Sequence, residues 1–251
     1  EPKPVETAAA PAVPLRAPLS RGRVLAILCL ILLIPLTLWW GSQMLNGRKY
    51  YLVSLLILLE AALPFWLSFE GRKPQARELI LLATLCALGV IGRAAFVMLP
   101  QCKPVTALTV LTGVALGSEA GFLVGSSTML VSNLLFGQGP WTPWQMAAMG
   151  LIGCLAGVIF RKGRLRPDPL FVCVFGGLAA LVVYGGIMNP AAALMWAHTL
   201  NWELLVTYYA AGLPMDLIHG VSTGLFLLVL TGPFLEKLGR VRSKYGLGTP
   251  H

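Results

Sequence analysis

Residues 104–136 read "PVTALTVLTGVALGSEAGFLVGSSTMLVSNLLF" and hold two apolar runs, 104–117 and 120–136. The apolar residues are continuous within each run instead of alternating with polar ones, so the pattern favours helices over strands. The second run follows the first after only Gly117, Ser118 and Glu119. A connection this short predicts a tight hairpin of two helices.

Similar apolar runs continue outward in both directions. Of the 251 residues, 57% are hydrophobic and 12% are charged, against roughly 25% charged residues in soluble domains. Runs of this kind can span a bilayer, which accepts only helices or closed barrels. We therefore predict an all-α polytopic membrane protein with eight apolar segments, at 24–41, 50–68, 78–98, 104–117, 120–136, 143–160, 169–188 and 207–232.

Four regions follow from these segments. Residues 1–23 are rich in Pro and Ala and predict a disordered cytoplasmic tail. Residues 24–70 predict two additional N-terminal transmembrane helices, and residues 77–235 a six-helix core. Residues 236–251 predict a basic cytoplasmic tail.

The basic residues lie mostly at the ends of the apolar segments. The formal net charge of +9 is therefore assigned to membrane topology and not to a nucleic-acid partner. With a cytoplasmic N-terminus, 15 of the 19 Lys and Arg residues lie in inner connections and three in outer ones. This bias predicts that both termini are cytoplasmic and that segments 99–104, 137–142 and 189–206 are outer loops, where we expect the function.

The stretch "FGQGPWTPWQM" at 136–146 contains two Pro, two Gly and two Trp residues. Gly137 is suited to end one helix, and Thr142 can N-cap the next with Gln145 three residues on, as in a capping box. The remaining loop exposes Trp141 beside Trp144. Either tryptophan could belong to an interfacial aromatic belt or to the wall of a ligand pocket.

Ionisable residues at membrane depth are costly and point to function. Arg93 lies in the outer half of its predicted helix, while Asp216 and His219 are three residues apart on one face of the last helix. Arg93 could pair with Asp216, either as a tie within the bundle or as part of a ligand site. Glu60 is the one charged residue of the predicted segment 50–68, so a packing or assembly role is expected for it.

Small residues recur every four positions in several predicted helices. Gly113, Gly117, Gly121 and Gly125 form one such series, and the pair Gly153 and Gly157 repeats the spacing. These series predict close helix packing inside the bundle. Ala83 and Ala87 share the same spacing near the inner end of their helix, where they could dock another membrane helix.

The sequence lacks the usual metal-binding and ATP-binding signatures. The five cysteines lack CxxC or metal spacing, and no HExxH or Walker A motif occurs. We therefore expect neither an enzyme, nor a bound metal, nor a primary pump in this chain alone. Two alternatives stay open: a secondary transporter or channel with an Arg93, Asp216 and His219 relay, and a membrane enzyme using His219 and Asp216.

Residues from about 77 to 240 resemble the substrate-binding S component of energy-coupling factor (ECF) vitamin transporters. The resemblance rests on "RAAFVMLPQCKPVTALTVLTGVALG" at 93–117, "GQGPWTPWQM" at 137–146 and "LPMDLIHGVSTGLF" at 213–226, with Ala83 and Ala87 as an AxxxA motif. It implies a multi-pass protein of the bacterial cytoplasmic membrane. The two extra N-terminal helices depart from the six-helix pattern.

The resemblance also implies how the work is divided between subunits. The S component captures a vitamin or cofactor outside, while a transmembrane T subunit and two ATPases, which use the ATP, drive release inside. The chain itself is expected to hold no cofactor. A corrinoid such as cobalamin is the substrate we expect, and riboflavin or thiamine would also fit. Ala83 and Ala87 would contact the T subunit. The expected substrate-binding residues are Arg93, Gln101, Lys103, Asn133, Gln138, Trp141, Trp144, Gln145, Trp196, His198, Asp216 and His219.

Overall fold

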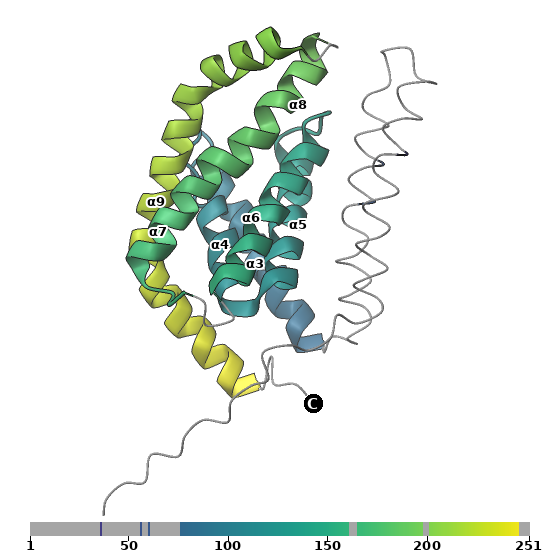
Figure 1. The fold of residues 1–251 in the computed structure, drawn as a ribbon. Coiled ribbons are helices and arrows are strands. Elements are labelled where there is room, and N and C mark those ends of the chain that lie inside the picture. Colours follow the sequence, from purple (N-terminus) through teal and green to yellow (C-terminus); the bar gives the residue numbers. More distant parts are fainter. Residues whose placement is uncertain are drawn as a thin grey trace, which may run out of the picture.

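The computed structural model describes Leu36, Leu56, Glu60 and residues 76–160, 165–197 and 201–245. The predicted tail at 1–23 and most of the two predicted N-terminal helices at 24–70 lie outside these residues. Every regular element in the described ranges is a helix (Figure 1). The elements are α3 (Ala76–Ala95), α4 (Val105–Leu116), α5 (Ser118–Phe136), α6 (Thr142–Phe160), α7 (Pro169–Leu178), the π-helix η1 (Ala179–Tyr184), α8 (Gly185–Ala197) and α9 (Trp202–Tyr245).

The helices form an all-α polytopic membrane protein, as predicted. Five helical segments in the described ranges are long and apolar enough to cross a bilayer, and α7, η1 and α8 together make one of them. Helix α4, with 12 residues, reaches only about 18 Å at 1.5 Å per residue. Successive spans run in opposite directions, so α3 begins at the same end of the bundle at which α9 ends (Figure 1).

The predicted hairpin between α4 and α5 is confirmed. Gly117 alone separates the two helices, and its φ of 102° is a left-handed value that favours glycine. Its N–H donates to the carbonyl of Gly113 at 2.8 Å, which satisfies the end of α4. The chain therefore reverses direction within one residue.

The predicted close packing at small residues is also confirmed. Gly113 of α4 and Gly121 of α5 both lie directly against the backbone of Gly153 in α6. A side chain at any of these positions would collide with main-chain atoms that cannot rotate away. Glycine at these three positions therefore sets the distance between α4, α5 and α6.

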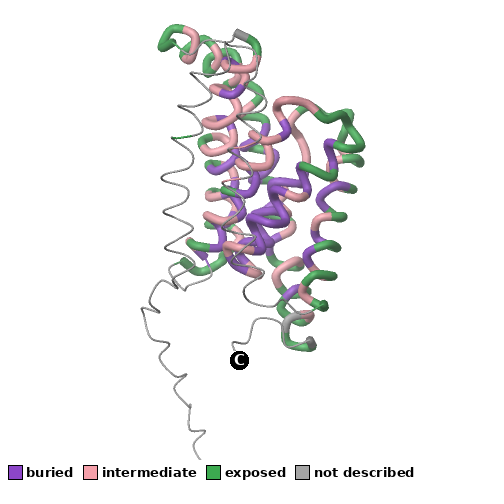
Figure 2. The backbone as a smooth tube through the Cα atoms, turned by 90° about the vertical axis from the view of Figure 1, so that its right-hand side faces the viewer, coloured by how far each residue is buried: buried purple, intermediate pink, exposed green. Residues whose placement is uncertain are grey.

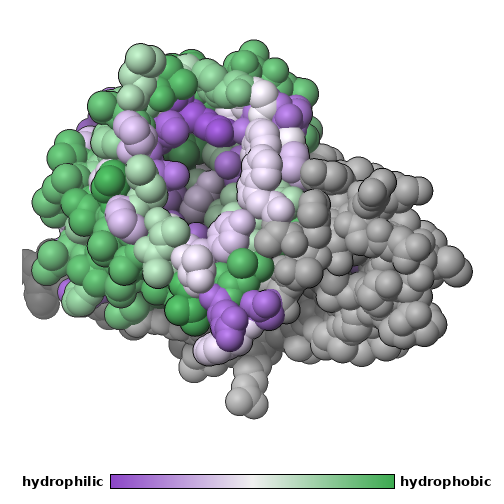
Figure 3. All heavy atoms as spheres, turned by 90° about the horizontal axis from the view of Figure 1, so that it is seen from above, coloured by the Kyte–Doolittle hydropathy of each residue, from purple (hydrophilic) through white to green (hydrophobic). Residues whose placement is uncertain are grey.

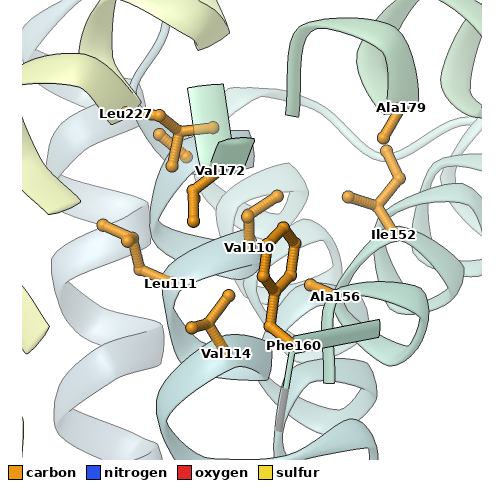
Figure 4. Close-up of a cluster of buried hydrophobic side chains, with 10 residues drawn as sticks. Val110, Leu111, Val114, Ile152, Ala156, Phe160, Val172, Ala179 and Leu227 are labelled. Carbon is orange, nitrogen blue, oxygen red and sulfur yellow. The ribbon is translucent and has the colours of Figure 1, made fainter. Parts of the chain in front are cut away.

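Large side chains fill the space next to this glycine contact. Val110 and Leu111 of α4, Ile152 of α6, Val172 of α7 and Leu227 of α9 are fully buried in one cluster (Figure 4). Buried residues follow the inner faces of the helices (Figure 2). Large apolar residues such as Leu134, which is 67% exposed, face outward. A membrane protein has this arrangement because lipid covers its outer surface.

One predicted loop is wrong. Segment 189–206 was expected to be an outer connection, yet α8 continues to Ala197 and α9 begins at Trp202. Pro190 cannot donate a hydrogen bond to the carbonyl of Gly186 four residues earlier. The Tyr209 hydroxyl of α9 donates to that carbonyl at 3.0 Å, so the helix continues through the proline. At its other end α9 extends past the predicted boundary at 232 to Tyr245.

Candidate functional site

A polar cavity lies near the end of the bundle at which α3 ends and α6 begins. Its volume is about 80 Å³, and nine residues from seven segments line it. Seen from this end, the molecule shows a hollow with hydrophilic side chains on its walls (Figure 3). The lining residues are Arg93, Gln101, Lys103, Val105, Met129, Gln145, Met149, Tyr184 and His219.

Arg93 enters the cavity from the last turn of α3 and is held by α5. Its Nη1 donates to the Ser132 hydroxyl and to Asn133 Oδ1, both at 2.6 Å. The guanidinium carbon also lies 5.7 Å from the centre of the Phe136 ring, a cation–π distance. These contacts fix the position of the charge without neutralising it.

Asn133 connects Arg93 to the beginning of α6. Its Nδ2 donates to Thr142 Oγ1 and to Gln145 Oε1, each at 2.9 Å. Thr142 Oγ1 also accepts the N–H of Gly139 at 3.3 Å. These bonds take the place of the predicted capping box between Thr142 and Gln145, since both side chains turn to Asn133. The network joins the cavity to the loop at 137–141.

His219 of α9 also lines the cavity. The ring is only 4% exposed, and its Nε2 forms a hydrogen bond of 2.8 Å with the Thr106 hydroxyl. The Tyr184 ring packs edge-on against it, with 4.8 Å between centroids. Its Nδ1 has no hydrogen-bond partner among the described residues. A buried ring nitrogen in that state is open to a ligand or to water.

Lys103 and Gln101 reach the cavity from the connection between α3 and α4. Burial lowers the pKa of the Lys103 ammonium, and the neighbouring Arg93 charge lowers it further. Gln101 has a φ of 54°, an uncommon left-handed value for a residue other than glycine. The Ser222 hydroxyl of α9 donates to the Gln101 carbonyl at 3.1 Å, which fixes this connection to the bundle.

The predicted pairing of Arg93 with Asp216 is wrong. Asp216 Oδ2 instead accepts a hydrogen bond of 2.7 Å from Asn189 Nδ2 in α8. The carboxylate packs against Gly185, where the missing side chain leaves room for it. Asp216 therefore joins α8 to α9 and does not line the cavity.

The other predicted binding residues lie apart from the cavity lining. Gln138 is exposed, and its amide donates to the carbonyl of Leu130 at 3.1 Å. Trp141 packs over Gly139, Trp144 is half-buried in the first turn of α6, and Trp196 is 69% exposed on α8. His198 lies outside the described residues. Five predicted residues do line the cavity: Arg93, Gln101, Lys103, Gln145 and His219.

Several contributors to the site were not predicted from the sequence. Tyr184 reaches the cavity from the end of η1, and π-helical turns are frequent at functional sites but have no simple sequence pattern. Met129 and Met149 read as ordinary apolar helix residues. Ser132 could have been predicted as a site residue because it directly precedes the predicted Asn133. In the structure both side chains accept hydrogen bonds from Arg93.

Ala83 and Ala87 lie around the middle of α3, outside the cavity lining, and both are exposed. No cluster of three or more His, Cys, Asp or Glu side chains that could hold a metal ion occurs in the part of the chain that the structure describes.

Comparison with known proteins shows which protein family this chain matches. A family model described as "ECF-type riboflavin transporter, S component" matches residues 73–236, which contain the whole cavity. A UPF0397 protein of Vibrio atlanticus (strain LGP32) is 28% identical over 122 residues, which cover 46% of this chain and 66% of that protein. The match thus spans slightly less than two thirds of the relative's length. No solved structure gives a significant match.

Proposed function

We propose that this chain, which belongs to the ECF-type riboflavin transporter S component family, captures a vitamin-sized molecule in its cavity at the outer face of the membrane. Members of this family are the substrate-binding components of transporters and are not enzymes. The single observation that carries the proposal is the polar cavity, which gathers side chains from seven segments of an otherwise apolar bundle.

The distribution of basic residues supports an outward-facing cavity. Helix α6 ends at Phe160, at the end of the bundle opposite to the cavity, and the sequence that follows it carries Arg161, Lys162, Arg164 and Arg166. Positive charge of this density favours the cytoplasmic side. The cavity then opens to the outside, with both termini inside.

The size of the cavity bears on the substrate. The cavity volume of about 80 Å³ lies below the roughly 300–1,000 Å³ range of small-molecule pockets, so a vitamin can enter only if the side chains or helices around the cavity move apart. A ligand with one ring system, such as the riboflavin in the family description, requires less movement than the corrinoid expected from the sequence, which is several times larger.

Membership of this family also bears on the partners of the chain. We propose that the chain works with a transmembrane T subunit and two ATPase subunits, whose functions the S component does not itself supply. The alternative of an ion relay has no comparable support, because Asp216 bonds Asn189 and lies outside the cavity lining that contains Arg93 and His219.

Binding to the purified full chain in lipid nanodiscs tests the proposal. Riboflavin, thiamine, biotin, nicotinate and cobalamin would be titrated separately by isothermal calorimetry. We expect saturable 1:1 binding of one ligand of single-ring-system size, weakened by His219→Ala and unchanged by Trp196→Ala, which alters an exposed tryptophan. Cobalamin as the tightest ligand would overturn the size argument, and no binding at all would overturn the proposed site.

A further inference from the structure

We propose that Arg93 and Lys103 bind an acidic group of the captured molecule, a carboxylate or a phosphate. The inference rests on the proposed function and adds the class of substrate. The cavity is thus specific for vitamins or vitamin derivatives that carry a negative charge. The outer loops predicted from the sequence are nearly uncharged, whereas the cavity itself is positively charged.

The first argument is the charge balance of the cavity. Arg93 and Lys103 both line it, and none of the nine lining residues is Asp or Glu. Two like charges in a partly buried space repel one another, and each also loses hydration. Such an arrangement is unfavourable while the cavity is empty of counter-charge, and an anionic ligand would relieve it.

The second argument is the geometry of Arg93. Its hydrogen bonds to Ser132 and Asn133 both use Nη1. The partners are a neutral hydroxyl and a neutral amide, so the guanidinium keeps its full charge. Its other N–H groups remain for a ligand, and the planar fork of arginine suits the two oxygens of a carboxylate or phosphate.

The third argument is what surrounds the two cations. The nearest candidate counter-ion in α9, Asp216, is engaged by Asn189 at 2.7 Å and does not line the cavity. His219, buried and with an unpartnered Nδ1, lines the same space. Gln101 and Gln145 add two amides. The cavity therefore combines two positive charges with neutral hydrogen-bonding groups, as an acidic head on an uncharged ring would need.

Matched ligand pairs test the inference. Two pairs differ by a phosphate, riboflavin against riboflavin 5′-phosphate and pyridoxal against pyridoxal 5′-phosphate. Two others differ by a carboxylate, nicotinamide against nicotinate and biotinamide against biotin. Affinities would be measured by calorimetry on the full chain in nanodiscs at constant ionic strength, for the wild type and for Arg93→Gln, Lys103→Gln and Arg166→Gln.

The expected result is that the acidic member of at least one pair binds about tenfold to hundredfold more tightly, as a charged hydrogen bond predicts. Lys103→Gln should reduce this ratio to near one. Lys103 makes no described hydrogen bond within the fold, so this variant keeps the test valid even if Arg93→Gln fails to fold. Arg166→Gln, which removes a positive charge from the exposed connection before α7, should leave the ratio unchanged.

The pairs also separate this inference from the proposed function. Equal or tighter binding of the neutral members would overturn the inference while the capture function stands. A tenfold preference that survives in both Arg93→Gln and Lys103→Gln would overturn it as well. If no member of any pair binds, both proposals fail. A preference confined to the phosphate pairs or to the carboxylate pairs identifies the acidic group.

Discussion

At the scale of single residues, Gln101 combines a cavity position with an unfavourable backbone. Left-handed φ values cost a residue with a side chain about 1–2 kcal/mol, and its φ is 54°. The hydrogen bond from Ser222 to its carbonyl holds this conformation from α9. The side chain is thus presented to the cavity at the expense of local stability, a combination often found where ligands bind.

Substitutions at Gln101 separate the two effects. Gln101→Gly should raise the free energy of unfolding by about 1 kcal/mol, because glycine adopts this φ without strain, and it should weaken ligand binding. Gln101→Val should lower stability, since a β-branched residue tolerates this φ poorly. Thermal unfolding of the detergent-solubilised protein measures the first effect and ligand titration the second.

Gln138→Gly provides the matched control. Gln138 lies in an exposed connection, outside the cavity, and is not among the residues with positive φ. Glycine there gains no relief from strain and should be neutral or slightly destabilising, without effect on binding. If both glycine variants changed stability in the same direction, the strain argument for Gln101 would be lost.

At the scale of helices, the contact between Gly121 of α5 and Gly153 of α6 sets the distance between these two helices. The backbones touch there, so no rotamer change can make room for a methyl group. Gly153→Ala should therefore lower the free energy of unfolding by about 1–3 kcal/mol, the usual cost of overpacking. Loss of thermal stability and of folded protein after size-exclusion chromatography are the measurements.

Gly232→Ala in α9 is the control for this substitution. A methyl group at Gly232 would meet no atom within 4 Å. Alanine there should leave stability unchanged or raise it by up to about 1 kcal/mol, because alanine favours helix. A similar loss at Gly153 and Gly232 would mean that helix propensity, and not close packing, explains the glycines.

The hydrogen bond from Tyr209 to the Gly186 carbonyl allows α8 to pass through Pro190. Tyr209→Phe removes the hydroxyl and its hydrogen bond to that carbonyl, at a cost of about 0.5–1.5 kcal/mol. In a Pro190→Ala background the new N–H can bond the carbonyl instead, so Tyr209→Phe should then cost much less. Unfolding measurements on the four proteins of this cycle give the coupling. Additive costs would contradict the proposed compensation.

The sequence predicts those helix features that depend on local pattern. The hairpin at Gly117 and the contacts of Gly121 and Gly153 follow from spacing alone. Arg93 and His219 stand out because polar groups are rare at membrane depth, whereas Gln101, Lys103 and Gln145 were expected from the family resemblance. The choice of Ser132 and Asn133 over Asp216 as partners of Arg93 depends on how each helix is rotated about its axis, which spacing does not define. The helix at 189–197 required Tyr209, a residue of another helix.

At the scale of the whole molecule, the cavity and the exposed alanines occupy different parts of α3. Arg93 is in the last turn of the helix, while Ala83 and Ala87 are one turn apart on an exposed face around its middle. At 1.5 Å per residue, Ala83 lies about 15 Å and Ala87 about 9 Å from Arg93 along the axis. Ligand capture and subunit docking can therefore be altered independently in one helix.

Ala83→Leu and Ala87→Leu test the docking role that we propose for this face. A leucine would keep the T subunit helix from approaching closely, so we expect the tagged chain to lose its T subunit and ATPases in co-purification from cells that express all four. Ligand affinity of the purified chain should remain within about twofold of the wild type. Ala210→Leu, at an exposed alanine of α9, should retain the complex. Normal assembly of both α3 variants would move the docking surface elsewhere, whereas loss of assembly in Ala210→Leu as well would show that added bulk on the lipid-facing surface, and not this particular face, is what the complex rejects.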